Sequence, residues 1–250
     1  MIDTHCHLSK EYYDDLDLIV DNMNGYMIVS GCNMKTNKEV LDLIKKYDKV
    51  YGTLGLHPTE NEDFNDKNLK FIEQNLKNPK ILAIGEIGLD YYWEKDKKNL
   101  QKEWFIKQIE LANKYNLPIV IHSREATNDT YQILKKYSKT KKVLHCYSSS
   151  LEMAYEFIKL DTMLGIGGVV TFKNSEKLKN IVKAIDLKYL LLETDSPYMS
   201  PVPLRGKTNQ PCNVKYVAEK IAEIKNISVD EVIKTTTENA IERFDLKEVI

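Results

Sequence analysis

Side chains able to bind metal or move protons stand at or just beyond the ends of short apolar runs. Histidine does so at five positions and a carboxylate at two: His5, His7, His57, His122, His145, Glu86 and Asp195. The run Leu-Pro-Ile-Val-Ile-His at 117–122 is typical of a buried parallel strand whose last side chain is polar. Imidazole and carboxylate groups that converge would form the ligand set of a hydrolytic metal centre.

The pair His5 and His7 is the first sign of such a centre. The two residues are two positions apart, so on a strand both rings leave the same face and can hold one ion. Taken alone, the pair fits two polar residues at a strand end equally well. Further groups stand at separate strand ends: Glu86, His122, His145 and Asp195. Six groups exceed the three or four protein ligands of a single zinc ion, so we expect two divalent ions.

The fold that would bring these residues together can be predicted from the alternation of patterns. Eight strand-like segments are separated, for the most part, by helix-like ones, and they lie at 1–7, 26–31, 50–56, 81–87, 118–122, 142–147, 163–172 and 189–194. This alternation predicts a parallel α/β sheet, and eight strands predict closure into a (β/α)8 TIM barrel, whose active site lies at the carboxyl ends of the strands. An open doubly wound sheet usually has fewer strands and a glycine-rich loop after the first one, which is absent here.

Amphipathic patterns predict the helices that cover this sheet. They lie at 39–47, 101–115, about 150–159, 213–225 and about 229–244. Ser149 and Ser228 each precede a glutamate by three residues, which predicts that they cap the helices at about 150–159 and about 229–244.

Composition limits the class of protein. The 250 residues fit one barrel domain spanning 1–250, and a net charge of −1 gives no global attraction to nucleic acid or membrane. A polyanionic substrate must therefore be held by a local patch and by metal. Four cysteines without a C-x-x-C pair, and a first strand starting at residue 2, lead us to expect a cytoplasmic protein without a signal peptide. No apolar stretch approaches ~20 residues, so we expect no membrane partner, and a monomer is the simplest expectation.

Seven motifs, in order along the chain, resemble those of the TatD family of metal-dependent deoxyribonucleases, which has an amidohydrolase-type barrel. The motifs are Met1–His7, Gly55–Pro58, Gly85–Tyr92, His122–Arg124, His145–Tyr147, Glu193–Pro197 and Arg205–Pro211. The resemblance continues to Thr237-Glu-Asn-Ala240, close to the end of the chain. One departure is Asn209-Gln210-Pro211, where many members have Asn-Glu-Pro, so this loop loses a carboxylate.

The resemblance implies a dinuclear site. It places His5, His7 and Asp195 on one ion, His122 and His145 on the other, and Glu86 between them. A shared carboxylate offsets the repulsion of two cations, and Lys80, which precedes its strand, cannot take this role as a carbamylated lysine does in related barrels. Asp195 and Glu86 are the expected catalytic residues, with Asp195 accepting a proton from the attacking water. Zinc, manganese and magnesium all suit such a site.

The resemblance also implies that His57, on the Gly-Leu-His-Pro turn, touches the substrate phosphate or the leaving group; the alternative is a histidine that only orients its loop. Arginine forks and lysine suit phosphate, so Arg124, Arg205 and Lys207 are expected to bind substrate. Their alternative role is a salt bridge to Asp90 or Glu125. Asp90 is equally consistent with a partner that orients a ligand histidine.

The aromatic run Tyr91, Tyr92 and Trp93 after the fourth strand has two interpretations. The rings suit stacking of exposed bases, as in proteins that bind single strands, and they suit packing equally well.

Three functions remain open from the residues. The first is hydrolysis of phosphodiester bonds from an end of single-stranded DNA, from the 3′ end as the resemblance implies. The second is an amidohydrolase or esterase that uses the same metals on a small molecule or an aminoacyl ester. The third is a non-catalytic binding protein on a degenerate barrel, which the complete ligand set disfavours. The cationic residues at the rim favour the phosphate substrate.

Overall fold

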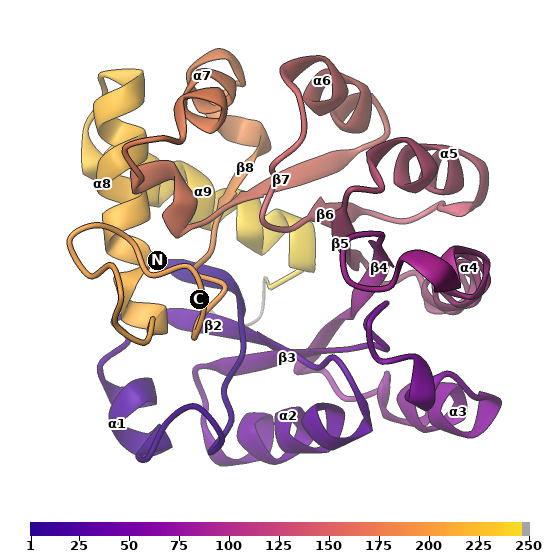
Figure 1. The fold of residues 1–250 in the computed structure, drawn as a ribbon. Coiled ribbons are helices and arrows are strands. Elements are labelled where there is room, and N and C mark those ends of the chain that lie inside the picture. The colour runs from indigo at the N-terminus through magenta and orange to yellow at the C-terminus, as the bar shows by residue number, and fades with distance from the viewer. Residues whose placement is uncertain (247–250) are drawn as a thin grey trace. The chain divides into compact units, whose positions relative to one another are not determined.

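The structure is a computed structural model that describes residues 1–246 (Figure 1). Its strands form one sheet in the order β1 to β8. They are β1 (Ile2–Cys6), β2 (Tyr26–Ser30), β3 (Val50–Leu54), β4 (Ile81–Asp90), β5 (Ile119–Arg124), β6 (Lys142–Leu144), β7 (Thr162–Ile166) and β8 (Leu190–Leu192). Consecutive parallel strands joined by helices are the arrangement of a (β/α)8 barrel, so the predicted fold class is confirmed.

Five of the α-helices in the described residues overlap predicted segments, whereas the helices at 16–21, 66–75, 127–137 and 176–184 were not predicted individually. The α-helices within the described residues are α1 (Leu16–Asp21), α2 (Met34–Lys46), α3 (Asp66–Asn75), α4 (Lys98–Tyr115), α5 (Thr127–Tyr137), α6 (Leu151–Lys159), α7 (Glu176–Ala184), α8 (Val214–Lys225) and α9 (Val229–Phe244). Short 3-10 turns are η1 (Asn61–Asp63), η2 (Lys95–Lys97), η3 (Gly168–Thr171), η4 (Leu187–Tyr189) and η5 (Pro211–Asn213). In residues 1–246 no helix is both long and apolar enough to cross a membrane.

Two strand ends differ from the sequence prediction in a way that matters for the site. The seventh strand, expected to reach Phe172, ends at Ile166, because the chain then turns into η3. The fourth strand runs beyond its apolar residues as far as Asp90, because pairing with β5 continues to the Asp90–Arg124 register. Glu86 and Asp90 therefore stand on one strand, four residues apart.

One compact unit contains residues 30–144 and 160–162. Helix α2 packs on β3 and α4 packs on β4, with Val40 and Phe105 among the buried side chains. Gly88 has a φ of +144°, and a Cβ there would lie 2.0 Å from the carbonyl oxygen of His122. Glycine at this position therefore allows β4 and β5 to approach closely where the polar residues Glu86 and His122 stand.

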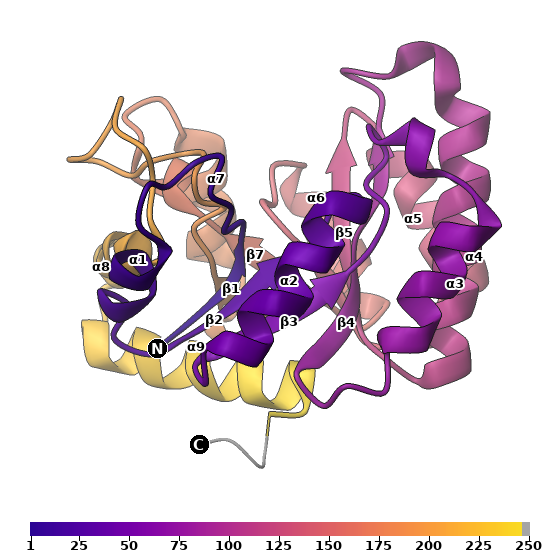
Figure 2. The ribbon, with the colours of Figure 1, turned by 90° about the horizontal axis from the view of Figure 1, so that it is seen from below.

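The other unit contains residues 1–29, 145–159 and 163–246 of the described chain. Helix α9 packs on β1 and β8, and Figure 2 shows α9 next to β1. The Asn239 amide donates to the carbonyls of Leu187 and Leu190, each at 2.9 Å. Because Leu190 begins β8, α9 lies at the amino end of this strand and leaves its carboxyl end to the site. Ser228 caps α9 as predicted, whereas α6 is capped by Ser150 rather than by Ser149.

Candidate metal centre

Four of the six predicted metal ligands gather within the unit that holds β1 and β8. His5 lies on β1 and His7 just after it, His145 follows β6, and Asp195 follows β8. The Nε2 atoms of His5 and His7 are 3.3 Å apart. Asp195 Oδ1 lies 3.7 Å from His5 Nε2 and 3.5 Å from His7 Nε2, and the ring of His145 stacks on that of His5 at 4.0 Å. Nitrogen and carboxylate oxygen atoms that face one another at these distances suit a divalent cation between them.

Asp195 is held in place by its backbone. It has a left-handed φ of +54°, and its N–H donates to the carbonyl of His5 at 3.0 Å. Burial by itself would raise the pKa of Asp195, but a hydrogen bond with His7 and the nearby imidazoles of His145 and His5 outweigh it and lower the pKa. The carboxylate is therefore charged near neutral pH, as a ligand or a proton acceptor requires.

Two buried carboxylates that were not assigned from the sequence support this group. Asp3 accepts hydrogen bonds from the backbone N–H and the hydroxyl of Thr194, at 2.9 and 2.6 Å, and so ties β1 to the segment after β8. Glu193 is fully buried and accepts the N–H of Cys146 at 2.6 Å, next to His145. Burial raises the pKa of Asp3 well above its ordinary value, although the Thr194 hydrogen bonds oppose this.

A sequence signal for Asp3 was available. It is two residues before His5 and four before His7, so the period of a strand places all three on one face. Glu193, two residues before Asp195, had no comparable partner along the chain. Its space is instead provided by Gly165 on β7, where a Cβ would lie 2.1 Å from the Glu193 carboxylate.

The remaining two predicted ligands, Glu86 and His122, meet in the other unit, and His57 joins them. Glu86 Oε1 lies 3.1 Å from His122 Nδ1 and 3.3 Å from His57 Nε2. Glu86 is almost fully buried, and the thiol of Cys32 donates to its other oxygen at 3.5 Å. One donor atom from each of His57, Glu86 and His122 falls within a span of 4.8 Å, which is compatible with a shared cation.

The hydrogen bonds of the two histidines distinguish their chemistry. His122 Nε2 contacts Asp90 Oδ2 at 2.9 Å, so its Nδ1 is the atom left to face Glu86. A carboxylate behind an imidazole in this way orients a metal ligand and increases its basicity. This is the orienting role that the sequence offered as one interpretation of Asp90. Burial would raise the pKa of Asp90, but the contact with His122 and the N–H groups of Trp93 and Tyr92 lower it overall.

In His57 the other ring nitrogen is held: a neighbouring residue contacts Nδ1, whereas in His122 the held nitrogen is Nε2. His57 Nδ1 accepts the backbone N–H of Thr59 at 3.2 Å and lies 2.7 Å from the Thr59 hydroxyl. With a lone pair required on Nδ1, the proton of the neutral ring stays on Nε2, the atom that faces Glu86. In this tautomer His57 presents an Nε2–H donor to Glu86 Oε1, 3.3 Å away, and it would have to lose this proton from Nε2 before that atom could bind a cation.

The cationic side chains expected to bind substrate are exposed. Arg124 ends β5 and stacks on Tyr92, with its guanidinium carbon 4.1 Å from the ring centroid. Arg205 lies over Phe172 at 3.8 Å and donates to the Ser200 carbonyl at 3.1 Å. Within residues 1–246 neither arginine forms a salt bridge, so the alternative pairing with Asp90 or Glu125 is not observed for Arg124, and its charge is available to a ligand. Lys207 is exposed on the loop that carries Arg205.

The aromatic run after β4 divides into two kinds of residue. Tyr91 is buried, and its hydroxyl donates to Asp129 at 2.7 Å. Tyr92 and Trp93 are 41% and 66% exposed. Packing therefore accounts for Tyr91 alone.

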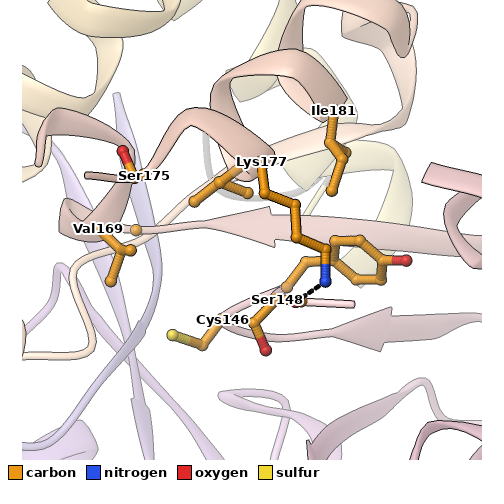
Figure 3. Close-up of a pocket in the computed structure, with 9 residues that line it drawn as sticks. Cys146, Ser148, Val169, Ser175, Lys177 and Ile181 are labelled. Atoms are coloured by element: carbon orange, nitrogen blue, oxygen red, sulfur yellow. Dashed lines mark hydrogen bonds between the residues drawn. The ribbon is translucent and has the colours of Figure 1, made fainter. Parts of the chain in front are cut away.

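A cavity of about 200 Å³ lies within the unit that holds β1 and β8, between the segment after β6, η3 and α7 (Figure 3). Cys146, the neighbour of His145, lines it, and Lys177 reaches from α7 to donate to the Ser148 carbonyl at 3.3 Å. Its wall contains none of the predicted metal-binding or substrate-binding side chains. The candidate metal ligands therefore lie at the strand ends and not in this cavity.

Comparisons with known proteins agree with the fold and with metal chemistry. Residues 2–245 match the model of the family described as TatD related DNase. The chain is 42% identical over 247 residues to the metal-dependent hydrolase YabD of Bacillus subtilis, covering 96% of this chain and 97% of YabD. It is 34% identical to the metal-dependent hydrolase YcfH of Escherichia coli K12, covering 98% of this chain and 96% of YcfH. The crystal structure of YjjV, a TatD homologue from E. coli K12, superposes with a TM-score of 0.90 at 31% identity, covering 98% of each chain.

Proposed function

The chain belongs to the TatD-related DNase family and is a metal-dependent hydrolase, and from this premise we propose that it is a deoxyribonuclease that shortens single-stranded DNA from the 3′ end. The observation that carries the proposal is the exposed guanidinium groups of Arg124 and Arg205, which have no carboxylate partner in the described chain. Phosphate oxygens are the natural partners of such groups, whereas a neutral ester offers them nothing of comparable charge.

The proposed cofactor is a pair of divalent cations. In the division that the family resemblance implies, His5, His7 and Asp195 would hold one ion, His122 and His145 would hold the other, and Glu86 would contribute its carboxylate to both. The donor chemistry supports this set, since imidazoles and carboxylates suit zinc and manganese, and magnesium where oxygen ligands dominate. The orientation of His122 by Asp90 supports it as well, because ligand histidines commonly have such a partner.

The protein's own side chains supply the remaining chemistry. Bound cations would contribute Lewis acidity toward water and toward the phosphate oxygens. Asp195, whose carboxylate lies 3.5 Å from His7 Nε2 and 3.7 Å from His5 Nε2, is the proposed acceptor of the proton that the attacking water loses. Arg124, Arg205 and Lys207 bind phosphate groups of the strand. His57 donates a hydrogen bond from Nε2–H to a phosphate oxygen or to the leaving-group oxygen, in keeping with the lone pair that Thr59 requires on Nδ1.

The direct test uses purified protein stripped of metal and then reloaded with zinc, manganese or magnesium. Its substrates are single-stranded and duplex DNA, each labelled at the 5′ or the 3′ end, and a set of small esters. We expect metal-dependent cleavage of the single strand, with 5′-labelled products that shorten progressively and label released at once from the 3′ end. Duplex DNA should be cleaved more slowly. Cleavage of esters without cleavage of DNA would replace the nuclease proposal with the esterase alternative.

A matched pair of variants connects the activity to the exposed cations. Replacing Arg205 by glutamine removes a proposed phosphate contact, so we expect a higher KM for DNA and an unchanged KM for neutral esters. Replacing Lys188 by glutamine serves as the control, because this exposed lysine is already paired with Asp186 at 3.4 Å. An equal effect of the two variants would remove the main support for a phosphate substrate.

A further inference from the structure

The exposed rings of Tyr92 and Trp93 form a surface with a planar cation against it. The Arg124 guanidinium carbon lies 4.1 Å from the Tyr92 ring centroid and 5.5 Å from that of Trp93. The two rings meet edge to face, with centroids 4.8 Å apart. Single exposed aromatic residues are common and need no ligand. An exposed pair that holds an arginine suits a ligand with a flat face and a negative charge.

Two lysines also lie over aromatic rings of this segment. Lys95 lies 5.9 Å from the centroid of Tyr92, and Lys98 lies 4.5 Å from that of Tyr91. Within the part of the chain that the structure describes, none of Arg124, Lys95 and Lys98 forms a salt bridge. The nearby Glu94 is paired with Lys97 at 3.3 Å. An anionic ligand would therefore meet cations whose charge is not already compensated.

The rings stand on a segment that is fixed before any ligand arrives. Asp90 Oδ1 accepts the backbone N–H groups of Tyr92 and Trp93, at 2.9 and 2.8 Å. The buried amide of Gln101 accepts the N–H of Asp90 at 2.8 Å and donates to the carbonyls of Asp90 and Glu94, at 2.9 and 3.0 Å. Because this turn is already ordered, binding to it carries a smaller entropic cost.

The same segment is connected to a ligand histidine. The second oxygen of Asp90 contacts His122 Nε2 at 2.9 Å. Arg124 is two residues beyond His122 on β5, so its side chain leaves the same face of the strand about 6.6 Å farther along. A DNA strand with one backbone phosphate near His122 would therefore bring a neighbouring nucleotide to Arg124 and the rings.

We propose that Tyr92, Trp93 and Arg124 bind one nucleotide of single-stranded DNA, with its base stacked on the exposed Trp93 ring and its phosphate on Arg124. The inference rests on the proposed function and deepens it by explaining why the substrate would be single-stranded rather than duplex DNA. A base within a duplex is covered on both faces by its neighbours, whereas a base in a single strand offers a face to stack. Stacking of this kind tolerates any base, so this site would select the single strand without reading its sequence.

The test is binding of a short phosphorothioate-linked oligothymidylate, which resists hydrolysis, to the metal-loaded protein. The chain has two tryptophans, and the other one, Trp104, is 4% exposed. We therefore expect the oligonucleotide to quench the fluorescence of Trp93, and the quenching to disappear in Trp93→Phe. Trp93→Ala should raise the Kd about 5- to 150-fold, while Trp93→Phe, which keeps a ring, should remain closer to the wild type. Tyr155→Ala, at a similarly exposed ring on α6, is the control and should bind like the wild type.

Hydrolysis of bis(p-nitrophenyl) phosphate separates this inference from the proposed function. That small diester has no flanking nucleotide to place on the rings, so Trp93→Ala should lose far less activity on it than on end-labelled single-stranded DNA with ordinary phosphodiester bonds. If the wild type cleaves DNA but Trp93→Ala binds and cleaves it as Tyr155→Ala does, the stacking site is wrong and the nuclease stands. If the wild type hydrolyses no phosphodiester, the proposed function fails first. A change of sedimentation in Trp93→Ala, with DNA binding unaltered, would assign the rings to a protein contact and overturn the inference.

Discussion

Replacement of Asp195 by asparagine removes one negative charge from the group around His5 and His7 and changes almost nothing else. The two side chains have the same shape, and asparagine accepts the left-handed φ of +54° as readily as aspartate does. The N–H of residue 195, which lies 3.0 Å from the carbonyl oxygen of His5 in the structure, can still donate to it in the variant. We therefore expect a folded protein whose free energy of unfolding changes by less than about 2 kcal/mol without metal.

The effect on turnover should be much larger. Asp195 Oδ1 lies 3.5 and 3.7 Å from the Nε2 atoms of His7 and His5, so the carboxylate stands where a cation and a proton would both be held. The amide oxygen of asparagine has no charge to attract the cation and almost no basicity to accept the proton. Loss of a positioned general base alone lowers a rate about 10²- to 10⁴-fold, equivalent to about 2.7–5.5 kcal/mol in the barrier. We expect kcat/KM for Asp195→Asn to fall by at least this range.

The assay is hydrolysis of bis(p-nitrophenyl) phosphate and of end-labelled single-stranded DNA by metal-loaded protein, with metal content measured on the same samples. Asp245→Asn is the matched control, because Asp245 also has a left-handed φ, of +55°, at the exposed end of α9. It makes the same change of charge and shape away from the site and should keep full activity. A folded Asp195→Asn protein with wild-type turnover would refute the assignment of Asp195.

Three smaller changes test the residues around the ligands. His57→Gln removes the ring that faces Glu86 and should lower kcat/KM about 10- to 150-fold in the hydrolysis assay, whereas an unchanged value would leave His57 a purely structural role. Thr194→Val removes the hydroxyl that donates to buried Asp3 at 2.6 Å and should cost about 1–3 kcal/mol in urea unfolding, with Thr194→Ser as the control that retains the donor. For Asp129, hydrogen bonds from a lysine and a tyrosine lower the pKa below its ordinary value of 3.8, so this carboxylate stabilises the fold above pH 3.8 and loses that effect as pH falls through its folded pKa. Urea midpoints measured from about pH 5 downward should therefore converge for wild type and Asp129→Asn, and a constant difference would contradict the linkage.

The strands and the polar residues at their ends were predictable because both signals are local. A run such as Ile119-Val120-Ile121 is buried on both faces, so a polar residue directly after it stands out in the sequence. Strand order then follows from the right-handed alternation of strands and helices, which leaves few topologies. The end of β4 was missed because Gly88 and Asp90 are poor strand formers, and only pairing with β5 extends the strand over them.

Which side chains meet was harder to predict. His57 was placed on the rim by its turn, yet the structure brings its Nε2 to 3.3 Å from Glu86, a contact between residues far apart in the sequence. The burial of Glu193 depends on space left by Gly165, which no local pattern reveals. Tyr91, Tyr92 and Trp93 look alike in composition, and only the contact between Tyr91 and Asp129 shows that Tyr91 is turned inward while the other two remain outside.

The two ligand groups differ in how much of the polypeptide must be synthesised before each is complete. His57, Glu86 and His122 all lie within the continuous stretch 30–144, together with the orienting carboxylate Asp90. The group around His5 requires Asp195, which leaves the ribosome far later. Translation therefore delivers every residue of the group around Glu86 before the group around His5 is complete.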